Sequence, residues 1–406
     1  MITNISGYGI RPLSIQTSAR IQRVKPSPTL AVTALANQLR AEGRDVIGLA
    51  AGEPDFDTPD HIKQAAIRAI NNGMTKYTAV DGTAGLKQAI INKFKRDNGL
   101  DYAADQVLVS VGGKQAIYNL LQALLNPGDE VIIPAPYWVS YPDMVMLADG
   151  EPVIVAGEMN QAFKITAQQL RDAITGRTRL VIINSPSNPS GKAYTRDELK
   201  ALADVLLEHP DIVILTDDIY EHIVWTDEGF NNILNVCPEL KDRTLVINGV
   251  SKAYSMTGWR IGYTGGPADI IKGMKKVQSQ STSNPCSIAQ AAAQEALDGD
   301  QSFLAEMCQV FHDRHDFVYN TLINMDGVEC LPSDGTFYSF PSFHSVIERM
   351  DGIEDDVQLA QLLLEKAEVA LVPGSAFGLP GHIRLSFATD MQSLEKALTR
   401  IAEAVR

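Results

Sequence analysis

Two hydrophobic patterns alternate along the chain from about Asp60 to Leu297. Stretches with apolar residues three and four positions apart, as in amphipathic helices, are separated by short β-branched runs. These runs are apolar on both faces, which is typical of a mainly parallel sheet covered by helices. We therefore predict an α/β architecture with ligands at the carboxyl ends of the strands. The predicted helices contain HIKQAAIRAI, KQAIYNLLQALL, RDELKALADVLLE and ADIIKGMKKVQ, and the predicted strands contain QVLVSV, DEVIIP, RLVIIN, DIVILT and RTLVIN.

The pattern changes after about Asp300. A long helical stretch precedes the short runs GVECL, GTFYSF, VALVPG and HIRLSFA, with helices between and after them. This mixture predicts a second, smaller α+β domain. The early helix PTLAVTALANQLRAEG has no βαβ rhythm, so we assign it to the small domain as well. The predicted organisation is an arm at 1–17, the first part of the small domain at 18–57, a large domain at 58–298 and the rest of the small domain at 299–406.

Composition narrows the class of protein. With 406 residues, 45% of them hydrophobic, the chain is long enough for two or three domains around a large core. Acidic residues outnumber basic ones by 49 to 35, which gives no support to nucleic-acid binding. The four cysteines are scattered, so neither a disulfide framework nor a metal site is predicted. Apolar runs fall short of the about 18 residues of a membrane helix, and the N-terminus lacks signal-peptide order, so we expect a cytoplasmic protein without a membrane partner.

Lys252 is surrounded in the sequence by small residues. Lys252 follows the strand RTLVIN among small residues, eight positions before Arg260, which is flanked by Gly258 and Gly262. Small neighbours let a planar ring approach the backbone, and a lysine in a pocket loses charge and becomes an amine that can form an imine. Arg260 can clamp a phosphate with its planar fork. From this segment alone, a solvated lysine and a strand-loop-strand with a structural arginine stay open as alternatives.

The segment from Gly249 to Gly262 resembles the lysine-attachment signature of class-I aminotransferases that depend on pyridoxal phosphate (PLP), and the resemblance extends from about Ser18 to the C-terminus. It implies fold type I, with a seven-stranded, mainly parallel sheet between helices, and a homodimer with shared active sites. Lys252 would be the catalytic residue and carry PLP as a Schiff base. Gly249 departs from the pattern, because many members have a phosphate-binding serine there.

Two further strand ends match the family. PLP chemistry needs a protonated ring nitrogen, which a carboxylate stabilises. ILTDDIY resembles the family's Asp-x-x-Tyr, so Asp217 would hold the ring nitrogen and Tyr220 the 3′-oxygen, with Asp218 facing elsewhere because side chains alternate along a strand. In NPSG, Asn188 would contact the 3′-oxygen and the substrate carboxylate. The alternatives are a helix cap or solvated turn for the aspartates and an ordinary loop for Asn188.

A glycine pair joins a strand to a helix in SVGGKQAIYN. The backbone N–H groups of Gly112 and Gly113 can face a phosphate at the helix N-terminus. The segment fails the P-loop motif at Leu108 and Gln115, so an ATPase is a weak alternative. In the resemblance, Gly112, Gly113 and Lys114 form the loop over the cofactor phosphate.

Four other positions receive roles from the resemblance. Tyr77 would reach the phosphate of the partner subunit, and its alternative is a core tyrosine. Trp138 would stack on the cofactor ring, and Gly52 would bring its backbone close to the substrate. Arg384 is a lone arginine in an apolar strand and needs an anion there. That anion would be the substrate α-carboxylate, and the alternative is an internal acidic partner.

The substrate prediction depends on residues that could bind its distal carboxylate. Animal-type members read the distal carboxylate with an arginine lent by the other subunit, but the corresponding VQSQSTSNPCSIAQ contains none. The sequence instead resembles the bacterial branch, in which Lys114 and Thr29 would recognise acidic substrates such as aspartate, glutamate and prephenate. We predict ping-pong transfer from L-aspartate to 2-oxoglutarate. The alternatives are an aromatic or alanine donor, a PLP lyase on the same fold, or a PLP-binding regulator.

Overall fold

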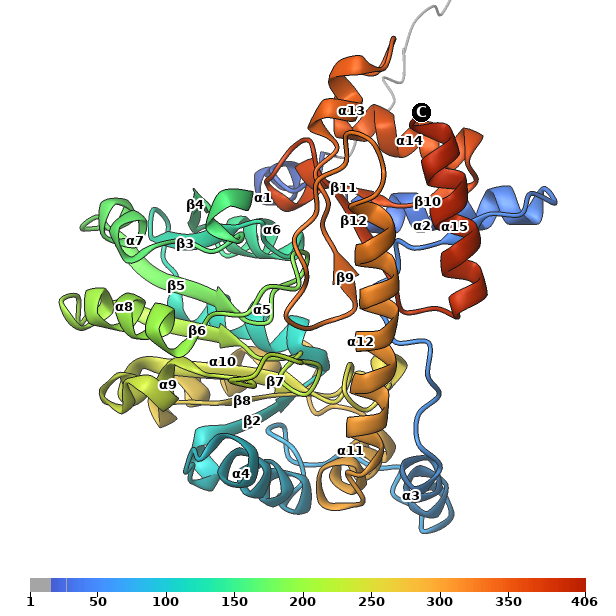
Figure 1. The fold of residues 1–406 in the computed structure, drawn as a ribbon. Helices are drawn as coiled ribbons and strands as arrows, with labels where there is room; N and C mark the ends of the chain where they lie inside the picture. Colours follow the sequence, from blue (N-terminus) through green and yellow to red (C-terminus); the bar gives the residue numbers. More distant parts are fainter. Residues whose placement is uncertain (1–15, 27) are drawn as a thin grey trace, which may run out of the picture.

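The computed structural model describes residues 16–26 and 28–406, so the predicted arm at 1–17 falls outside them up to residue 15 (Figure 1). A seven-stranded sheet forms the centre of the larger part, and every neighbouring pair is parallel except the two that involve β8. The predicted fold class is confirmed. In spatial order the strands are β2 (Val107–Ser110), β8 (Gly262–Gly265), β7 (Thr244–Gly249), β6 (Val213–Asp217), β5 (Thr178–Asn184), β3 (Glu130–Ala135) and β4 (Glu151–Ala156).

Alternate side chains of the central strands enter two different cores. Ile214 and Val246 pack on the face covered by α4 (Ala84–Asn98), α8 (Arg196–Leu207) and α11 (Ser287–Asp298). Leu215 and Ile247 pack on the opposite face, which is covered by α5 (Gly112–Leu124), α6 (Ser140–Leu147) and α10 (Ala268–Ser279). Each such fully buried side chain contributes about 1.5–3 kcal/mol. Burial on both faces explains why these strands read as continuous apolar runs.

Local sequence fixes where the helices begin. Thr195 caps α8, because its hydroxyl accepts from the Glu198 N–H at 3.3 Å while Glu198 Oε2 accepts from the Thr195 N–H at 2.8 Å. Beside the edge strand β2, α5 begins at Gly112, two residues after that strand ends. This short connection places the N-terminus of α5 at the rim of the sheet.

Both ends of the described chain build the smaller part. Strand β1 (Ile47–Gly48) pairs in parallel with β10 (Val369–Ala370), and α2 (Pro28–Ala41) packs on β10 and β11. In Figure 1 the blue α2 accordingly lies among the orange and red elements. The domain boundaries at 18, 58 and 299 stay predictions. The remaining elements of this part are β11 (Val372–Pro373), β12 (Ile383–Ser386), β9 (Tyr338–Ser339), α12 (Phe303–Leu322), α13 (His344–Arg349), α14 (Asp356–Lys366) and α15 (Met391–Ala404).

The structure also corrects details of the predicted elements. Strands β4 and β8 were not predicted, and GVECL forms no strand but a single bridge from Glu329 to Ser342. Among the described helices, none has the length and apolar character needed to cross a membrane. The other helices are α1 (Ala19–Gln22), α3 (Asp60–Asn71), α7 (Ala167–Ala173) and α9 (Ile233–Val236), with 3₁₀ turns at Ala104–Gln106, Met159–Gln161, Pro238–Arg243, Thr257–Trp259 and Gly374–Phe377.

Candidate active site

A cavity of about 460 Å³ opens at the carboxyl ends of β5, β6 and β7. Side chains from the large sheet, from α2 and from β12 line it together. Gly112 adjoins the cavity next to Arg260, whereas Tyr77 lies outside it. The predicted site residues that line the cavity are Thr29, Gly52, Gly113, Lys114, Trp138, Asn188, Asp217, Tyr220, Lys252, Arg260 and Arg384.

The two aspartates at the end of β6 have different surroundings. Asp217 lines the cavity, where its Oδ2 accepts from the Tyr141 hydroxyl at 2.6 Å. Asp218 is held away from the cavity by Asn232, whose Nδ2 donates to Asp218 Oδ2 at 2.5 Å. Burial raises the pKa of Asp217, while the Tyr141 hydrogen bond and the charge of Lys252 counteract it. A cation placed against Asp217 would favour its ionised form.

Lys252 points its amine into the cavity. Its Nζ donates to the carbonyl oxygen of Gly52, and a Cβ at Gly52 would lie 2.9 Å from the Tyr338 hydroxyl, so this backbone approach requires glycine. Burial and the charge of Arg384 lower the pKa of Lys252 to about 8. Because Lys252 is partly buried and its Nζ is hydrogen-bonded inside the cavity, it is not the solvated lysine of the alternative. Near neutral pH a useful fraction of the amine is unprotonated and nucleophilic.

A cradle without side chains lies at the start of α5. Gly112 has φ +81°, and a Cβ there would lie 2.4 Å from a guanidinium nitrogen of Arg260. A Cβ at Gly262 would lie 2.3 Å from the backbone nitrogen of Gly113. The guanidinium and the first N–H groups of a helix therefore converge on one small space, which fits a phosphate.

The departure at Gly249 has a packing reason. A Cβ there would meet the Ile261 carbonyl oxygen at 3.0 Å and the Gly262 Cα at 3.1 Å, where β7 and β8 lie close together. A serine would crowd that contact. Ser251 lines the cavity two residues later.

Arg384 is a buried cation on the opposite wall. Its guanidinium donates to Asn188 Oδ1 at 3.0 Å and to the Ala50 carbonyl oxygen at 2.6 Å, and it lies 4.5 Å above the Tyr338 ring. Its Nε is buried without a hydrogen-bond partner. Among residues 16–26 and 28–406, no carboxylate pairs with Arg384, so an internal acidic partner within them is ruled out. The charge is available to an anion in the cavity.

Lys114 and Thr29 stand at the other side of the cavity. Lys114 Nζ lies 4.8 Å from the centre of the Trp138 ring, and burial together with Arg260 lowers its pKa. Lys114 is also exposed to solvent, so its ammonium stands at the open side of the cavity over an aromatic face. One turn after Thr29, the Thr33 hydroxyl donates to the Thr29 carbonyl oxygen at 2.9 Å and also lines the cavity.

The sequence analysis missed several cavity residues. Tyr141 donates to Asp217, and Tyr338 shares a 3.0 Å hydrogen bond with Tyr220 while supporting Arg384. Asn184 donates to the Asp217 carbonyl oxygen at 2.8 Å and accepts from the Asn188 N–H at 2.9 Å. Each lies within a few residues of a predicted strand or motif, but its orientation depends on the packing of that element against others.

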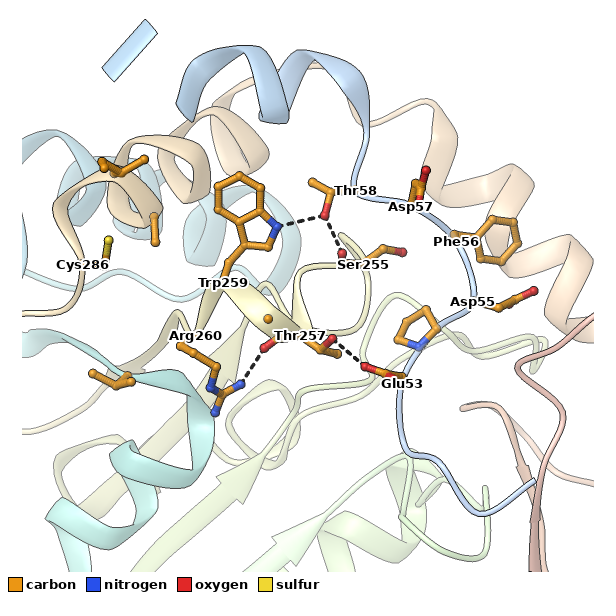
Figure 2. A pocket seen from close by; sticks show the side chains of 15 residues that line it. Glu53, Asp55, Phe56, Asp57, Thr58, Ser255, Thr257, Trp259, Arg260 and Cys286 are labelled. Carbon is orange, nitrogen blue, oxygen red and sulfur yellow. Dashed lines mark hydrogen bonds between the residues drawn. The ribbon is translucent and has the colours of Figure 1, made fainter. Parts of the chain in front are cut away.

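A second, more open hollow of about 780 Å³ adjoins the cavity, and both are lined by Glu53, Thr257 and Arg260 (Figure 2). Figure 2 shows Arg260 donating to the Thr257 carbonyl oxygen, at 2.8 Å, on the side of this hollow. Tyr77 lines a neighbouring hollow that shares Cys286 and Ile288 with this one, and 89% of its surface is exposed, so the core alternative for Tyr77 is wrong.

Comparisons with known proteins agree with this geometry. The family model for class I and II aminotransferases matches residues 44–401. An aspartate/prephenate aminotransferase of Nitrosomonas europaea is 58% identical over 96% of this chain and 99% of its own length. The crystal structure of the aspartate aminotransferase from Rhizobium meliloti superposes with a TM-score of 0.93 at 50% identity, covering 96% of this chain and 99% of that one. The Thermus thermophilus aspartate aminotransferase with maleate gives 0.91 at 43% identity, covering 96% and 100%.

Proposed function

The chain belongs to the class I and II aminotransferases, and from this premise we propose that it transfers the amino group of L-aspartate to 2-oxoglutarate, giving oxaloacetate and L-glutamate. It is a PLP-dependent aminotransferase that acts on amino acids and 2-oxo acids. The relatives named above carry aspartate in their names, which supports this donor.

The observation that carries the proposal is a pair of cations facing one cavity. Arg384 is buried without an acidic partner in the described chain, and Lys114 stands beside Trp138 at the other side. A dicarboxylic amino acid has one carboxylate for each cation. Arg384 and Asn188 would hold the α-carboxylate, while Lys114 and Thr29 would read the distal one.

The residues present fit PLP. Gly112, Gly113 and Arg260 would hold its phosphate, because the absence of a side chain at Gly112 lets the Arg260 guanidinium lie against the first N–H groups of α5. Asp217 would hold a proton at the ring nitrogen. These assignments stay predictions residue by residue, as do the others for the cofactor: Lys252 for the covalent bond, Tyr220 and Asn188 for the 3′-oxygen, Lys114 beside the phosphate loop and Trp138 against the ring face.

The chain's own groups account for the proton movements. PLP supplies, when bound, a ring that withdraws electrons from the substrate Cα. Lys252, with a pKa of about 8, would take the proton from Cα and return it on the other side of the transferred nitrogen. Asn188 accepts from Arg384 through Oδ1, which leaves its Nδ2 to donate to the cofactor oxygen. α2 would exclude water by covering the cavity with Thr29 and Thr33.

We further propose that the enzyme works as a homodimer with shared active sites. Ile67 and Ile70, three positions apart on α3, and Met74 and Tyr77 in the segment that follows are all exposed hydrophobic side chains. Several large exposed hydrophobic side chains within one short segment are typical of an interface. Tyr77 of the partner subunit would reach the phosphate through the hollow beside Arg260. The cytoplasm stays our prediction for where the enzyme works.

Prephenate, a 2-oxo acid, is a second candidate acceptor of the amino group, because the Nitrosomonas relative is named for both aspartate and prephenate. Lys114 carries a point charge that tolerates varied carboxylate positions better than a bidentate arginine would. Prephenate also has two carboxylates, so the same two cations would serve it.

Steady-state kinetics with aspartate, glutamate, prephenate and an aromatic amino acid as substrates test the proposal. We expect kcat/KM to be highest with aspartate, and Lys114→Ala to lower it about tenfold for aspartate while leaving an aromatic amino acid within about twofold, because a hydrogen bond to a charged group is worth about 1.5 kcal/mol or more. Gln122→Ala on the same helix is the matched control. Unimpaired aspartate turnover in Lys114→Ala would show that another residue reads the distal carboxylate.

A further inference from the structure

A fully buried lysine lies behind the turn that follows β6, on the side away from the cavity. Lys93, on α4, exposes none of its surface, and lysines almost never occupy such positions unless they are paired. Its Nζ contacts the Glu221 carboxylate and donates to Asn98 Oδ1 at 2.7 Å. Asn98 in turn donates through Nδ2 to Glu221 Oε2 at 2.7 Å. The three side chains therefore form a closed triangle, which we call the Lys93 triangle.

The chain after β6 turns its polar side chains to two sides. Asp217 and Tyr220 line the cavity. Asp218 and Glu221 point away from it, where Asn232 holds Asp218 and the Lys93 triangle holds Glu221. Each outward residue is the direct neighbour of a cavity residue. Fixing the outward pair therefore fixes the inward pair.

Charges around the triangle are balanced through Lys93. Asp97, Glu221 and His222 bring ligand-type atoms within 4.8 Å of one another, and the Lys93 ammonium contacts Glu221 there and lies 3.9 Å from Asp97. Burial acts most strongly on Glu221 and raises its pKa, but the charges of Lys93 and His222 and the hydrogen bonds from Lys93 and Asn98 together outweigh it, so the pKa falls below its usual value. Burial and the nearby Glu221 hold the pKa of Asp218 well above its usual range.

The other groups facing the triangle carry little free charge. Burial lowers the pKa of His222, so its ring is neutral near pH 7. Arg96 pairs with Asp97 at 2.6 Å. Burial raises the pKa of the Tyr254 and Tyr263 hydroxyls, which stay protonated. Lys93 and Glu221 thus face each other as opposite charges in a dry environment.

We propose that Lys93 is a positioning residue for the turn after β6. Its contacts with Glu221 and Asn98 hold this turn so that Asp217 and Tyr220 face the cofactor. The inference rests on the proposed function, because the roles of Asp217 and Tyr220 belong to it. A buried ion pair adds little net stability, but moving either partner leaves an unpaired buried charge. The pair therefore specifies one arrangement of the turn.

The test is PLP binding by the cofactor-free protein, together with the pH midpoint of the absorbance change in the loaded enzyme. Lys93→Met keeps the length of the side chain and removes the ammonium. We expect the Kd for PLP to rise about tenfold, the scale of losing an outer partner at a ligand site. The absorbance midpoint should move upward, because a displaced Tyr220 no longer stabilises the negative 3′-oxygen.

Two further variants protect the test against misfolding. Lys93→Met with Glu221→Gln leaves no unpaired charge, and Asn98→Ala opens the triangle without removing a charge; both should shift Kd and midpoint in the same directions. Lys87→Met is the matched control, because Lys87 lies on α4 like Lys93 but pairs with Asp81, at 2.7 Å, outside the triangle. It should lower the melting temperature and leave both readings unchanged.

The outcomes separate this inference from the proposed function. Wild-type Kd and midpoint in whichever of the three triangle variants fold would overturn the positioning role. Asp217→Asn serves as the reference. If Asp217→Asn shifts both readings and the triangle variants do not, only the role of Lys93 fails. If Asp217→Asn also leaves them unchanged, the proposed role of Asp217 fails instead.

Discussion

The two walls of the cavity are built in different ways. The wall that carries Asp217, Asn184 and Lys252 is formed by neighbouring parallel strands and the loops directly after them. The facing wall takes Thr29 and Thr33 from α2 and Arg384 from β12, segments that meet through the pairing of β1 with β10 and the packing of α2 on β10 and β11. The first wall is held by a continuous hydrogen-bonded ladder, and the second by a few contacts between the two ends of the described chain.

This difference assigns separate tasks to the walls. Groups that must stay within a few tenths of an ångström of a cofactor belong on a rigid sheet edge. Groups that admit a substrate and then exclude water belong on an element that packs through fewer contacts. Changes on the sheet wall should therefore lower kcat and cofactor binding, and changes on the facing wall should act mainly on KM.

Asp217→Asn is the largest expected effect on the sheet wall. The amide keeps the shape but removes the charge at the ring nitrogen, so we expect kcat to fall roughly 10³-fold, the scale of losing one preorganised electrostatic group. The neighbouring Asp218→Asn is the control, because Asp218 lies outside the cavity and an amide oxygen can still accept the hydrogen bond from Asn232. Its kcat should stay within about threefold. Equal losses in both variants would contradict the division between the two aspartates.

Arg384→Lys tests the facing wall. Lysine keeps the charge but loses the fork that holds Asn188, the Ala50 carbonyl and an incoming carboxylate together. We expect KM for aspartate to rise about 10- to 100-fold, the equivalent of one charge-assisted hydrogen bond, with a smaller change in kcat. Arg400→Lys, a partly buried arginine of α15 paired with Asp45, is the matched control. A fall in kcat without a change in KM would reverse the assignment of tasks.

The pH dependence of cofactor attachment joins the two walls. The pKa of Lys252 is lowered to about 8, so its reactive neutral form is dominant above that pH and becomes scarcer below it. The attachment rate of PLP to the cofactor-free protein should rise about tenfold per pH unit below the pKa and level off above it. Stopped-flow absorbance would measure it. Arg384→Gln removes a charge that lowers this pKa, so its plateau should begin at higher pH.

Sequence reasoning reached the sheet wall more completely than the facing wall. The strands around Asp217 and Lys252 could be predicted because burial on both faces leaves an uninterrupted apolar run. β4 escaped because it is an edge strand with a polar first residue, and β8 because GYTG is short and rich in glycine. Tyr141 and Tyr338 escaped because no local pattern tells which tyrosine turns toward a cavity.

Apart from Arg384, the facing wall was accessible only through the resemblance. Arg384 could be identified as a lone charge in an apolar strand, but its partners Asn188 and Ala50 are 196 and 334 residues away in the sequence. Nothing in the spacing of α2 indicates that Thr29 reaches the cavity. Its position follows from the contacts of α2 with β10, which form only in the folded chain.

The smallest expected effect concerns how the facing wall is held in place. Arg20 and Arg23, in and directly after α1, both donate to Asp149 in the turn between α6 and β4, at 2.6 and 2.5 Å. α1 is thereby tied to the large sheet, and α2 with Thr29 follows a few residues later. Asp149→Ala should free this segment for part of the time and raise KM in proportion to the lost competent fraction. Because these ion pairs are exposed, we expect about a two- to fivefold rise, with kcat unchanged.

Salt gives an independent reading of the same contact. In the wild-type enzyme, KM for aspartate should rise with ionic strength partly because salt screens the Asp149 pairs, and this part should be absent in Asp149→Ala. Glu208→Ala, which removes an exposed ion pair with Arg171 far from the cavity, should keep the wild-type salt dependence. Exchanging the charges, with Asp149→Arg and both Arg20→Asp and Arg23→Asp, should restore a low KM. A KM that is insensitive to all of these changes would mean that α2 is held by its packing on β10 and β11 alone, and the facing wall would then be as fixed as the sheet wall.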